Sequence, residues 1–370
     1  MINDGHITAS FGSELPGDPL PPEVQRWLVG LAADYRVLVP SEKSGNRIFE
    51  EVSASGTTGL GLPQHRTIGS FKKTFLPPAE TLLSFNAGAM SAAPPMEKTV
   101  IFGMHICELS ADRLLTDVMK YDCPDYPYVT RRQRALTIGV PCRRTDNCFC
   151  EKTGHNRAGP GSFDLFLNVP PGGDEGGLEL IAGSKAGVAL AKAAPMPLKK
   201  TPGTHPASPA GSASQKSPGV LAAPPPGDMA HKGQWPLAEL PERIRSSFGA
   251  VMWDELADRC LGCGNCTIVC PLCYCFFTRD ETGLDPAKGQ RARHWDSCQL
   301  VAFARVAGGH NFREARAERI WYRFSHKFMR MQEAFGRPGC TGCGACFHFC
   351  PADIDPRAVI ESVLAVTADE

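Results

Sequence analysis

Two copies of one cysteine motif constrain this chain more than any other feature. Residues 260–271 (motif 1) are CLGCGNCTIVCP and residues 340–351 (motif 2) are CTGCGACFHFCP. Both follow the pattern C-x2-C-x2-C-x3-C-P without a gap, and a run of this spacing holds 4Fe–4S clusters through cysteine thiolates. Structural zinc sites also use C-x2-C pairs, but they have no use for the complete pattern occurring twice. The sequence therefore predicts two 4Fe–4S clusters.

The spacing also predicts which thiols bind together. The three closely spaced cysteines of each motif lie on one loop, where glycines let the backbone approach the cluster and turn N–H groups toward the sulfurs. In chains with two such runs, the fourth cysteine of each run binds the other cluster. The predicted ligands are Cys260, Cys263, Cys266 and Cys350 for cluster 1, and Cys340, Cys343, Cys346 and Cys270 for cluster 2.

A further group of cysteines lies in the N-terminal half. Cys142, Cys148 and Cys150 follow a predicted strand ending at Val140, and Cys107 follows another predicted strand. If the two strand ends are neighbours, these four thiols can hold a third iron–sulfur cluster. The alternative is that they are buried free thiols, which are common in proteins. We take the C-x-C spacing to favour the cluster.

The remaining cysteines permit more than one interpretation. Cys273, Cys275 and Cys298 follow motif 1 closely. They are either ligands of an additional or alternative cluster or part of the sulfur-rich surroundings of the first, and both interpretations stay open. Cys123 has no companion and is interpreted as structural.

The overall composition limits the partners and the compartment. The 39 basic and 39 acidic residues give a formal net charge of zero, so neither nucleic acid nor an anionic membrane is expected as the main partner. The N-terminus lacks the basic and apolar regions of a signal peptide, and no run of about 18 apolar residues suggests direct membrane insertion. We therefore expect a cytoplasmic protein, in which the 16 cysteines are reduced and favour metal ligation over disulfides.

The chain is expected to have an α+β fold in several parts. A polar N-terminal arm (1–25) precedes a mixed α/β domain (26–192), and a linker (193–236) holds 10 of the 32 prolines. The C-terminal part (237–370) is predicted to be a two-cluster ferredoxin-like domain, with a helical insertion at 271–339.

Local patterns predict the main elements of these parts. Strands are expected over 36–40, 98–103, 135–140 and 163–169, and helices over 77–85, 109–119 and 299–335. Alternation of strands and helices predicts a partly parallel sheet. The basic segment 299–335 carries Trp321, Tyr322, Phe324 and Phe328, which form either a docking surface or part of the core.

No recognised motif indicates a substrate-transforming site. The sequence contains no G-x-G-x-x-G after a strand, no phosphate-binding loop, no nucleophile elbow and no H-E-x-x-H. The basic run 131–134 is interpreted as a solvated or docking loop, with an anion site as the alternative. His294, His310 and His326 lie near the motifs and are interpreted as surface or packing residues.

Taken together, these passages resemble a known family. The segment 100–108 (VIFGMHICE), the C-x-C at 148–150, the CPLCYC at 270–275, the RARHWDSC at 291–298 and motif 2 are similar to the iron–sulfur beta subunits of sulfhydrogenase-type nickel–iron hydrogenases and to the related iron–sulfur subunits of anaerobic sulfite reductase. The resemblance extends from about residue 35 to residue 360, apart from the linker. The chain departs from the family at His105 and Glu108, where the family has Arg and Asp in an Arg-x-Cys-Asp sequence.

The resemblance implies an electron-transfer subunit of a larger oxidoreductase. It would relay electrons through 4Fe–4S clusters between a flavin subunit that handles NAD(P)H and a catalytic subunit of the hydrogenase or reductase type. Two alternatives stay open: a self-contained flavin-dependent reductase and a redox-sensing scaffold.

Overall fold

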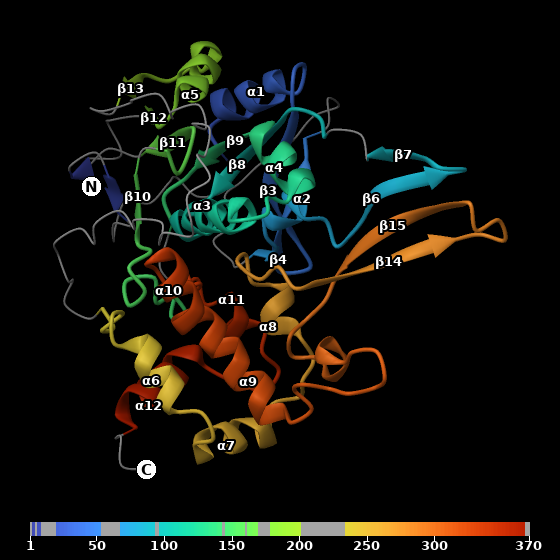
Figure 1. Cartoon of the computed structure of the whole chain (residues 1–370). Coiled ribbons are helices and arrows are strands. Elements are labelled where there is room, and N and C mark those ends of the chain that lie inside the picture. The colour runs from blue at the N-terminus through green and yellow to red at the C-terminus, as the bar shows by residue number, and fades with distance from the viewer. Residues whose placement is uncertain are drawn as a thin grey trace. The chain divides into compact units, whose positions relative to one another are not determined.

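A computed structural model of the chain is shown in Figure 1. Apart from two short strands at its start, the structure describes residues 20–52, 67–92, 96–142, 145–159, 161–168, 178–200 and 234–366. The chain divides into two compact units, each described here by itself. Unit 1 comprises Met1–Leu76, Ala92–Asp146 and His155–Ala213, and unit 2 comprises Pro77–Ser91, Asn147–Gly154 and Ser214–Glu370. Residues 201–233 of the predicted linker and residues 9–19 of the predicted arm lie outside the described residues.

Unit 1 is built on an eight-stranded mixed sheet. Its strands are β3 (Arg36–Lys43), β4 (Asn46–Glu51), β5 (Thr67–Gly69), β8 (Thr99–Met104), β9 (Ala135–Gly139), β11 (Leu165–Asn168), β12 (Glu179–Ala182) and β13 (Leu198–Lys200). Their spatial order is β13-β12-β11-β9-β8-β3-β4-β5. Because β3, β8, β9 and β11 pair in parallel, the predicted partly parallel sheet is confirmed, as are the four predicted strands. Strand β13 falls within the range predicted as linker.

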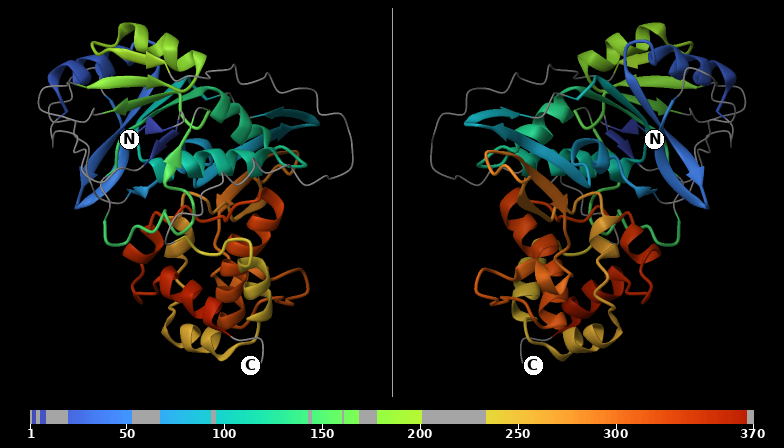
Figure 2. Two further views of the ribbon diagram at one scale, coloured as in Figure 1. Left: turned by 90° about the vertical axis from the view of Figure 1, so that its left-hand side faces the viewer. Right: turned by 90° about the vertical axis from the view of Figure 1, so that its right-hand side faces the viewer.

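Helices cover both faces of this sheet (Figures 1 and 2). On one face, Val37 and Val100 pack in a buried cluster with Trp27 of α1 (Pro22–Leu31) and Leu190 of α5 (Lys185–Leu190). Alternate strand residues point to opposite faces, so two apolar layers are buried. These layers explain why the strands are nearly continuous apolar runs.

The opposite face is covered by α3 (Ile106–Lys120), which confirms the helix predicted over 109–119. Here β9 ends at Gly139, where an added Cβ would lie 2.7 Å from Leu109 and 2.5 Å from Phe166. A larger residue here would require the side chains of Leu109 and Phe166 to shift.

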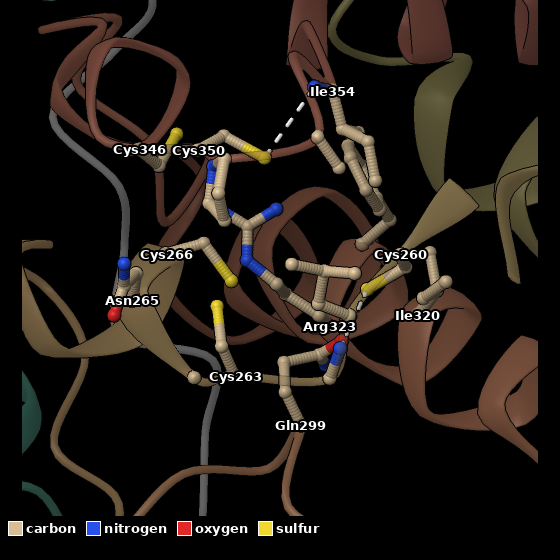
Figure 3. Close-up of a pocket in the computed structure, with 16 residues that line it drawn as sticks. Cys260, Cys263, Asn265, Cys266, Gln299, Ile320, Arg323, Cys346, Cys350 and Ile354 are labelled. Atoms are coloured by element: carbon tan, nitrogen blue, oxygen red, sulfur yellow. Dashed lines mark hydrogen bonds between the residues drawn. The ribbon is translucent and has the colours of Figure 1, made fainter.

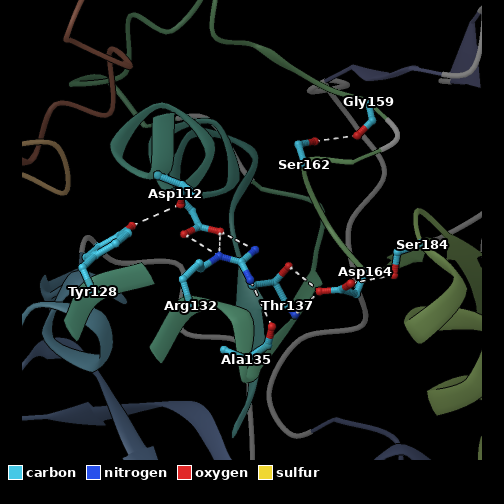
Figure 4. A network of polar contacts seen from close by, with 10 residues as sticks. Asp112, Tyr128, Arg132, Ala135, Thr137, Gly159, Ser162, Asp164 and Ser184 are labelled. Atoms are coloured by element: carbon cyan, nitrogen blue, oxygen red, sulfur yellow. Dashed lines mark hydrogen bonds and ion pairs between the residues drawn. The ribbon is translucent and has the colours of Figure 1, made fainter. Parts of the chain in front are cut away.

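A buried polar network fixes α3 to α4 (Tyr126–Gln133) and to β9 (Figure 4). The Arg132 Nε atom donates to both carboxylate oxygens of Asp112, at 3.0 and 2.8 Å, and Nη1 donates to the Ala135 carbonyl at 3.0 Å. Nearby, Asp164 accepts a hydrogen bond from the Thr137 backbone N–H at 2.8 Å. These bonds satisfy polar groups that would otherwise be costly to bury.

The basic run 131–134 belongs to this framework. Besides the contacts of Arg132, Arg131 donates to the Phe75 carbonyl at 3.1 Å and Arg134 donates to the Met96 carbonyl at 2.5 Å. Phe75 ends the short helix α2 (Lys72–Phe75). The run therefore lies at the end of α4 and not in a loop, and each of its three guanidinium groups has a partner within unit 1.

The predicted N-terminal arm contributes structure to unit 1. Strands β1 (Ile2–Asn3) and β2 (His6–Thr8) form an antiparallel three-stranded sheet with β10 (Arg157–Ala158). The arm range also includes the first turn of α1.

Unit 2 contains a four-stranded sheet that the sequence did not indicate. Its strands are β6 (Ala79–Asn86), β7 (Ala89–Ala92), β14 (Phe276–Thr282) and β15 (Lys288–Trp295), in the order β14-β15-β6-β7. The helix predicted over 77–85 is therefore wrong. Strand β6 pairs with β15, and the Thr81 hydroxyl donates to the side chain of Gln290, 209 residues later, at 2.8 Å. This distant pairing overrides the local helical pattern.

The insertion between the two motifs combines a hairpin with helices. It begins with β14 and β15, continues through a short 3-10 helix (Val301–Ala304), and ends with α9 (Arg316–Ser325), a π-helical segment (His326–Arg330) and α10 (Met331–Phe335). The expected helical insertion is present, but the helix predicted over the whole of 299–335 is confined to its second half.

The aromatic side chains of this segment pack the core of unit 2. Phe324 and Phe328 are each 1% exposed and cluster with Trp253, of α7 (Val251–Arg259), and with residues of α6 (Leu240–Ser246) and α12 (Pro356–Ala365). Trp321 packs against the same cluster and donates its indole N–H to the Ile244 carbonyl at 3.0 Å. The docking hypothesis is therefore wrong for Phe324 and Phe328.

Candidate iron–sulfur centre

Motif 1 forms a tight loop in unit 2. Cys260 follows the last residue of α7, and the one-turn helix α8 (Asn265–Ile268) starts after Gly264. Gly262 and Gly264 have φ angles of 63° and 80°, a left-handed conformation that glycine adopts without the steric cost of a Cβ. The two glycines fold Cys260, Cys263 and Cys266 onto one loop.

Motif 2 repeats this backbone conformation. Gly342 and Gly344 have φ angles of 63° and 75°, and α11 (Ala345–His348) starts after Gly344. The loop is also tightly covered, because a Cβ at Gly342 would lie 2.4 Å from the backbone nitrogen of Cys150. Two segments far apart in the sequence thus adopt the same loop conformation. Two sites that each hold a 4Fe–4S cluster would require this.

One pocket brings motif 1 together with the end of motif 2. Its lining includes five cysteines, Cys260, Cys263, Cys266, Cys346 and Cys350 (Figure 3). Cys270 is not among the described residues that line this pocket. Motif 2 therefore contributes two thiols beside the motif 1 loop, and one of them is Cys350, as the crossed set of ligands expects.

Backbone N–H groups point at these sulfurs. The Gly262 N–H donates to Cys260 Sγ and the Ile354 N–H donates to Cys350 Sγ, both at 3.4 Å. Such bonds stabilise negative charge on a thiolate and on a cluster that it holds. The donor set fits an iron–sulfur cluster, whose ligands must be deprotonated.

Two of the thiols predicted for cluster 2, Cys270 and Cys340, lie near a buried lysine, Lys327. Burial raises the pKa of Cys340 to about 12, an effect that the Lys327 charge opposes and that Cys346 and Cys343 reinforce. Lys327 Nζ lies 3.4 Å from Cys270 Sγ. One ammonium group thus lies close to thiols from both motifs.

Sequence reasoning missed the two buried cations of this centre, Arg323 and Lys327. Both are at most 7% exposed, and they lie four residues apart across the junction of α9 and the π-helical segment. Burial alone would lower the pKa of Arg323, but the charges of Cys266 and Cys346 raise it well above its usual range. The only sequence signal was the helical spacing of two basic residues among aromatic ones, which also suits a surface.

The thiols predicted for a third cluster are distributed over both units. Cys107 lies in the first turn of α3 and Cys142 follows β9, both in unit 1. Cys148 and Cys150 belong to unit 2, where the Phe149 N–H between them donates to the Gly342 carbonyl at 2.8 Å. Both therefore flank the loop of motif 2.

The residues that depart from the family pattern have a structural role. His105 and Glu108 form a capping box at the start of α3, with the His105 N–H donating to the Glu108 carboxylate at 3.0 Å. Arg47 Nη1 donates to the same carboxylate at 3.1 Å. Glu108 is thus fixed beside Cys107 by a buried ion pair.

The other cysteines separate into two groups. Cys273, Cys275 and Cys298 line a second pocket of unit 2. Cys123 is exposed in unit 1.

The three histidines singled out in the sequence make ordinary contacts or line that second pocket. His294 stacks on Phe277 and His310 packs edge-on against Phe312. His326 lines the second pocket.

The described cysteines do not form a site for a single ion. Within the described ranges, no three His, Cys, Asp or Glu side chains lie together in a way that could hold one metal ion. A cluster differs, because each thiolate binds a separate iron atom.

Comparison with known proteins places this centre in a class. Residues 259–354 match the 4Fe–4S dicluster domain, so the class is that of iron–sulfur proteins with two 4Fe–4S clusters. Sulfhydrogenase 2 subunit beta of Pyrococcus furiosus is 31% identical over 329 residues, which cover 89% of this chain and 92% of the relative. The chain therefore belongs to the sulfhydrogenase beta subunit family, and the predicted family and fold class are confirmed.

Two further comparisons are negative. No solved structure matches the chain significantly. In the part of the chain that the structure describes, no helix has the length and apolar character needed to cross a membrane.

Proposed function

We propose that this chain relays electrons between a flavin subunit that handles NAD(P)H and a catalytic subunit of the hydrogenase or reductase type, in a cytoplasmic complex. The observation that carries the proposal is the pair of identical cysteine loops with thiols from both motifs in one pocket. Such an arrangement would hold two clusters close together within one unit. The name of the P. furiosus relative also fits a multi-subunit assembly.

The proposed ligands are those of the crossed set. Cys260, Cys263, Cys266 and Cys350 would hold cluster 1, and Cys340, Cys343, Cys346 and Cys270 would hold cluster 2. When bound, such clusters supply one-electron redox chemistry. The chain's own residues hold the thiolates in place and keep water from the buried ones. They also direct backbone N–H groups and two buried cations toward the negative charge.

Exposure suggests where electrons would enter or leave. Leu261, beside Cys260, is 65% exposed, and Cys263 is exposed as well. In motif 2 the corresponding Thr341 is 2% exposed. Because electron exchange with a partner requires a short path, the loop of motif 1 is the proposed contact.

Paired variants test the ligand sets. Cys350→Ser and Cys263→Ser should remove the same component of the low-temperature EPR spectrum after anaerobic reduction, and Cys270→Ser and Cys343→Ser the other. Each should lose about four iron atoms per chain. Cys123→Ser, which alters an exposed thiol, should change neither. If Cys350→Ser instead removes the same component as Cys343→Ser, the crossed assignment is overturned.

A third cluster, held by Cys107, Cys142, Cys148 and Cys150, is a separate proposal. The C-x-C sequence, whose central Phe149 donates its N–H to the Gly342 carbonyl of motif 2, supports it. Cys107→Ser and Cys150→Ser should each remove about four iron atoms while both ferredoxin-type EPR components remain. Unchanged iron in both variants would show that these cysteines hold no cluster.

The relay hypothesis differs from its alternatives in the intact complex. If the chain is a relay, electrons from NAD(P)H reach the donor subunit of a complex that carries Cys263→Ser but go no further. A self-contained flavin reductase would instead show bound flavin in the isolated chain, and a redox-sensing scaffold would change its assembly on cluster oxidation. Bound flavin or oxidation-dependent assembly, with electron flow unaffected by Cys263→Ser, would reject the relay.

A further inference from the structure

A second group of thiols lies together in unit 2, outside both motifs. Cys273, Cys275 and Cys298 line one pocket, together with Tyr322, His326 and Lys327. The cavity has a volume of about 220 Å³. This is room for a group far larger than one water molecule, which occupies about 30 Å³ in the liquid.

The hairpin brings these thiols together. Cys275 directly precedes β14 and Cys298 follows β15, while Phe276 and Trp295 are directly paired at the hairpin's base. The Asp296 N–H donates to the Cys275 carbonyl at 2.9 Å, which closes this end. The Cys275 and Cys298 thiols are in hydrogen-bond contact with each other. The antiparallel pairing of β14 with β15 thus brings Cys275 and Cys298 to the same end of the hairpin.

Polar and cationic side chains border these thiols. Gln299 Nε2 lies 3.6 Å from Cys298 Sγ, and Arg323 and Lys327 both line the pocket. Deprotonated sulfur is the form that binds metal, and the two cations would offset its negative charge.

The lining also includes an imidazole. His326 and the Tyr274 hydroxyl are 3.3 Å apart, a bond that orients the ring. Burial and the charges of Lys327 and Arg330 keep its pKa at about 4, so the ring is neutral at physiological pH. Neutral imidazole is a common iron ligand. Three thiols and one imidazole thus give four donors around one cavity.

From this geometry we propose that Cys273, Cys275, Cys298 and His326 hold an additional 4Fe–4S cluster. A single-ion site is not formed by the described side chains, whereas a cluster binds one ligand at each of four separate irons. Cys273 is hydrogen-bonded to Cys270, a proposed ligand of cluster 2, so the additional carrier would lie next to the relay. The inference extends the proposed relay, but its test is separate.

Iron content and EPR test the assignment in the anaerobically purified full-length chain. Cys275→Ser and Cys298→Ser should each lose about four iron and four acid-labile sulfide per chain and retain both ferredoxin-type EPR components. The matched control Cys123→Ser should lose none. Full iron content in both pocket variants, or zinc in place of iron, overturns the proposal. If Cys263→Ser loses iron while the cluster in this pocket remains, the proposed relay ligands are supported independently of this site.

A second measurement uses the unaltered protein and does not depend on the folding of variants. N-ethylmaleimide should leave Cys273, Cys275 and Cys298 unmodified in the iron-loaded protein and label them after a chelator has removed iron, as read by peptide mass spectrometry. Labelling before iron removal overturns the proposal. His326→Ala should alter the EPR of this one cluster, and His326→Cys should restore four-donor binding. An unchanged spectrum in His326→Ala removes His326 from the set.

Discussion

Lys327 Nζ lies 3.4 Å from Cys270 Sγ and 2.9 Å from the Gly339 carbonyl oxygen. The side chain of this lysine is buried, and neither of these two partners is a carboxylate. Burial of an ammonium group is costly unless negative charge compensates it. Thiolates and a cluster bound to them would provide that charge. The lysine is therefore placed to affect the potential of cluster 2.

Replacing Lys327 should lower the midpoint potential of cluster 2. Reduction adds one negative charge, and the ammonium group stabilises that state more than the oxidised one. A hydrogen bond to a charged group contributes roughly 1.5–3 kcal/mol. For a one-electron couple this corresponds to a shift on the order of 100 mV. Lys327→Met should show this shift in an EPR-monitored redox titration.

Two controls separate charge from packing in that experiment. Lys327→Arg retains the charge and should shift the potential less than Lys327→Met. Lys288, at the start of β15, is exposed, so Lys288→Met should leave both clusters unchanged. Equal shifts for Met and Arg at position 327 would attribute the effect to packing.

Gly262 and Gly342 form a matched pair for testing the two loops. Both have φ of 63°, so alanine at either position costs roughly 1–2 kcal/mol for the left-handed conformation. A Cβ at Gly342 also meets the Cys150 nitrogen at 2.4 Å, whereas the nearest atom at Gly262 is 3.7 Å away. Gly342→Ala should therefore lose cluster 2, while Gly262→Ala should retain cluster 1 with a modest loss of thermal stability. Iron content together with EPR measures both outcomes, and equal losses would contradict the role of close packing.

The parts of the molecule that could be predicted are those whose structure depends on residues close together in the sequence. The cysteine loops, α3 and the buried strands β3, β8, β9 and β11 all have short-range patterns, and the structure has them in the predicted places. Strand β6 does not have such a pattern. Its conformation depends on β15, and the Arg293–Glu80 ion pair, with both side chains at most 4% exposed, forms only after the two segments meet.

The same distinction applies to the candidate site. The spacing of the motifs indicates the thiols proposed for clusters 1 and 2, because three proposed ligands of each lie within seven residues. Arg323 and Lys327 looked like the charged face of a basic helix, since their partners come from the distant motif segments. Likewise, the pocket of Cys275 and Cys298 depends on the pairing of β14 with β15, which the sequence did not indicate.

Leu261 should affect the exchange of electrons with a partner and leave iron binding unchanged. Its side chain is 65% exposed beside Cys260, so a charged residue there costs little stability but disfavours an apolar contact. Leu261→Glu should slow reduction of the clusters by the donor subunit, or their oxidation by the acceptor, in stopped-flow measurements. Leu284, at the tip of the β14–β15 hairpin, is fully exposed, and Leu284→Glu is the matched control. The same rate in both variants would place the contact elsewhere.

Arg132 should contribute to the stability of unit 1. Its pair with Asp112 has side-chain exposures of 21% and 1%, and removing one partner of a buried pair costs about 3–5 kcal/mol. We expect a loss near the lower end for Arg132→Met, because water partly screens the guanidinium group. Hydrogen exchange should accelerate in α3 and α4, which the pair joins.

The exposed neighbour Arg113 gives the control for that prediction. Arg113→Met removes a positive charge from α3 without touching the buried pair, so exchange in α3 and α4 should stay slow. Iron content should be unchanged in both variants, since the pair lies within unit 1 and its two members contact α3, α4 and β9. Faster exchange of similar size in Arg113→Met would show that net charge, not the Arg132–Asp112 pair, stabilises this part of the unit.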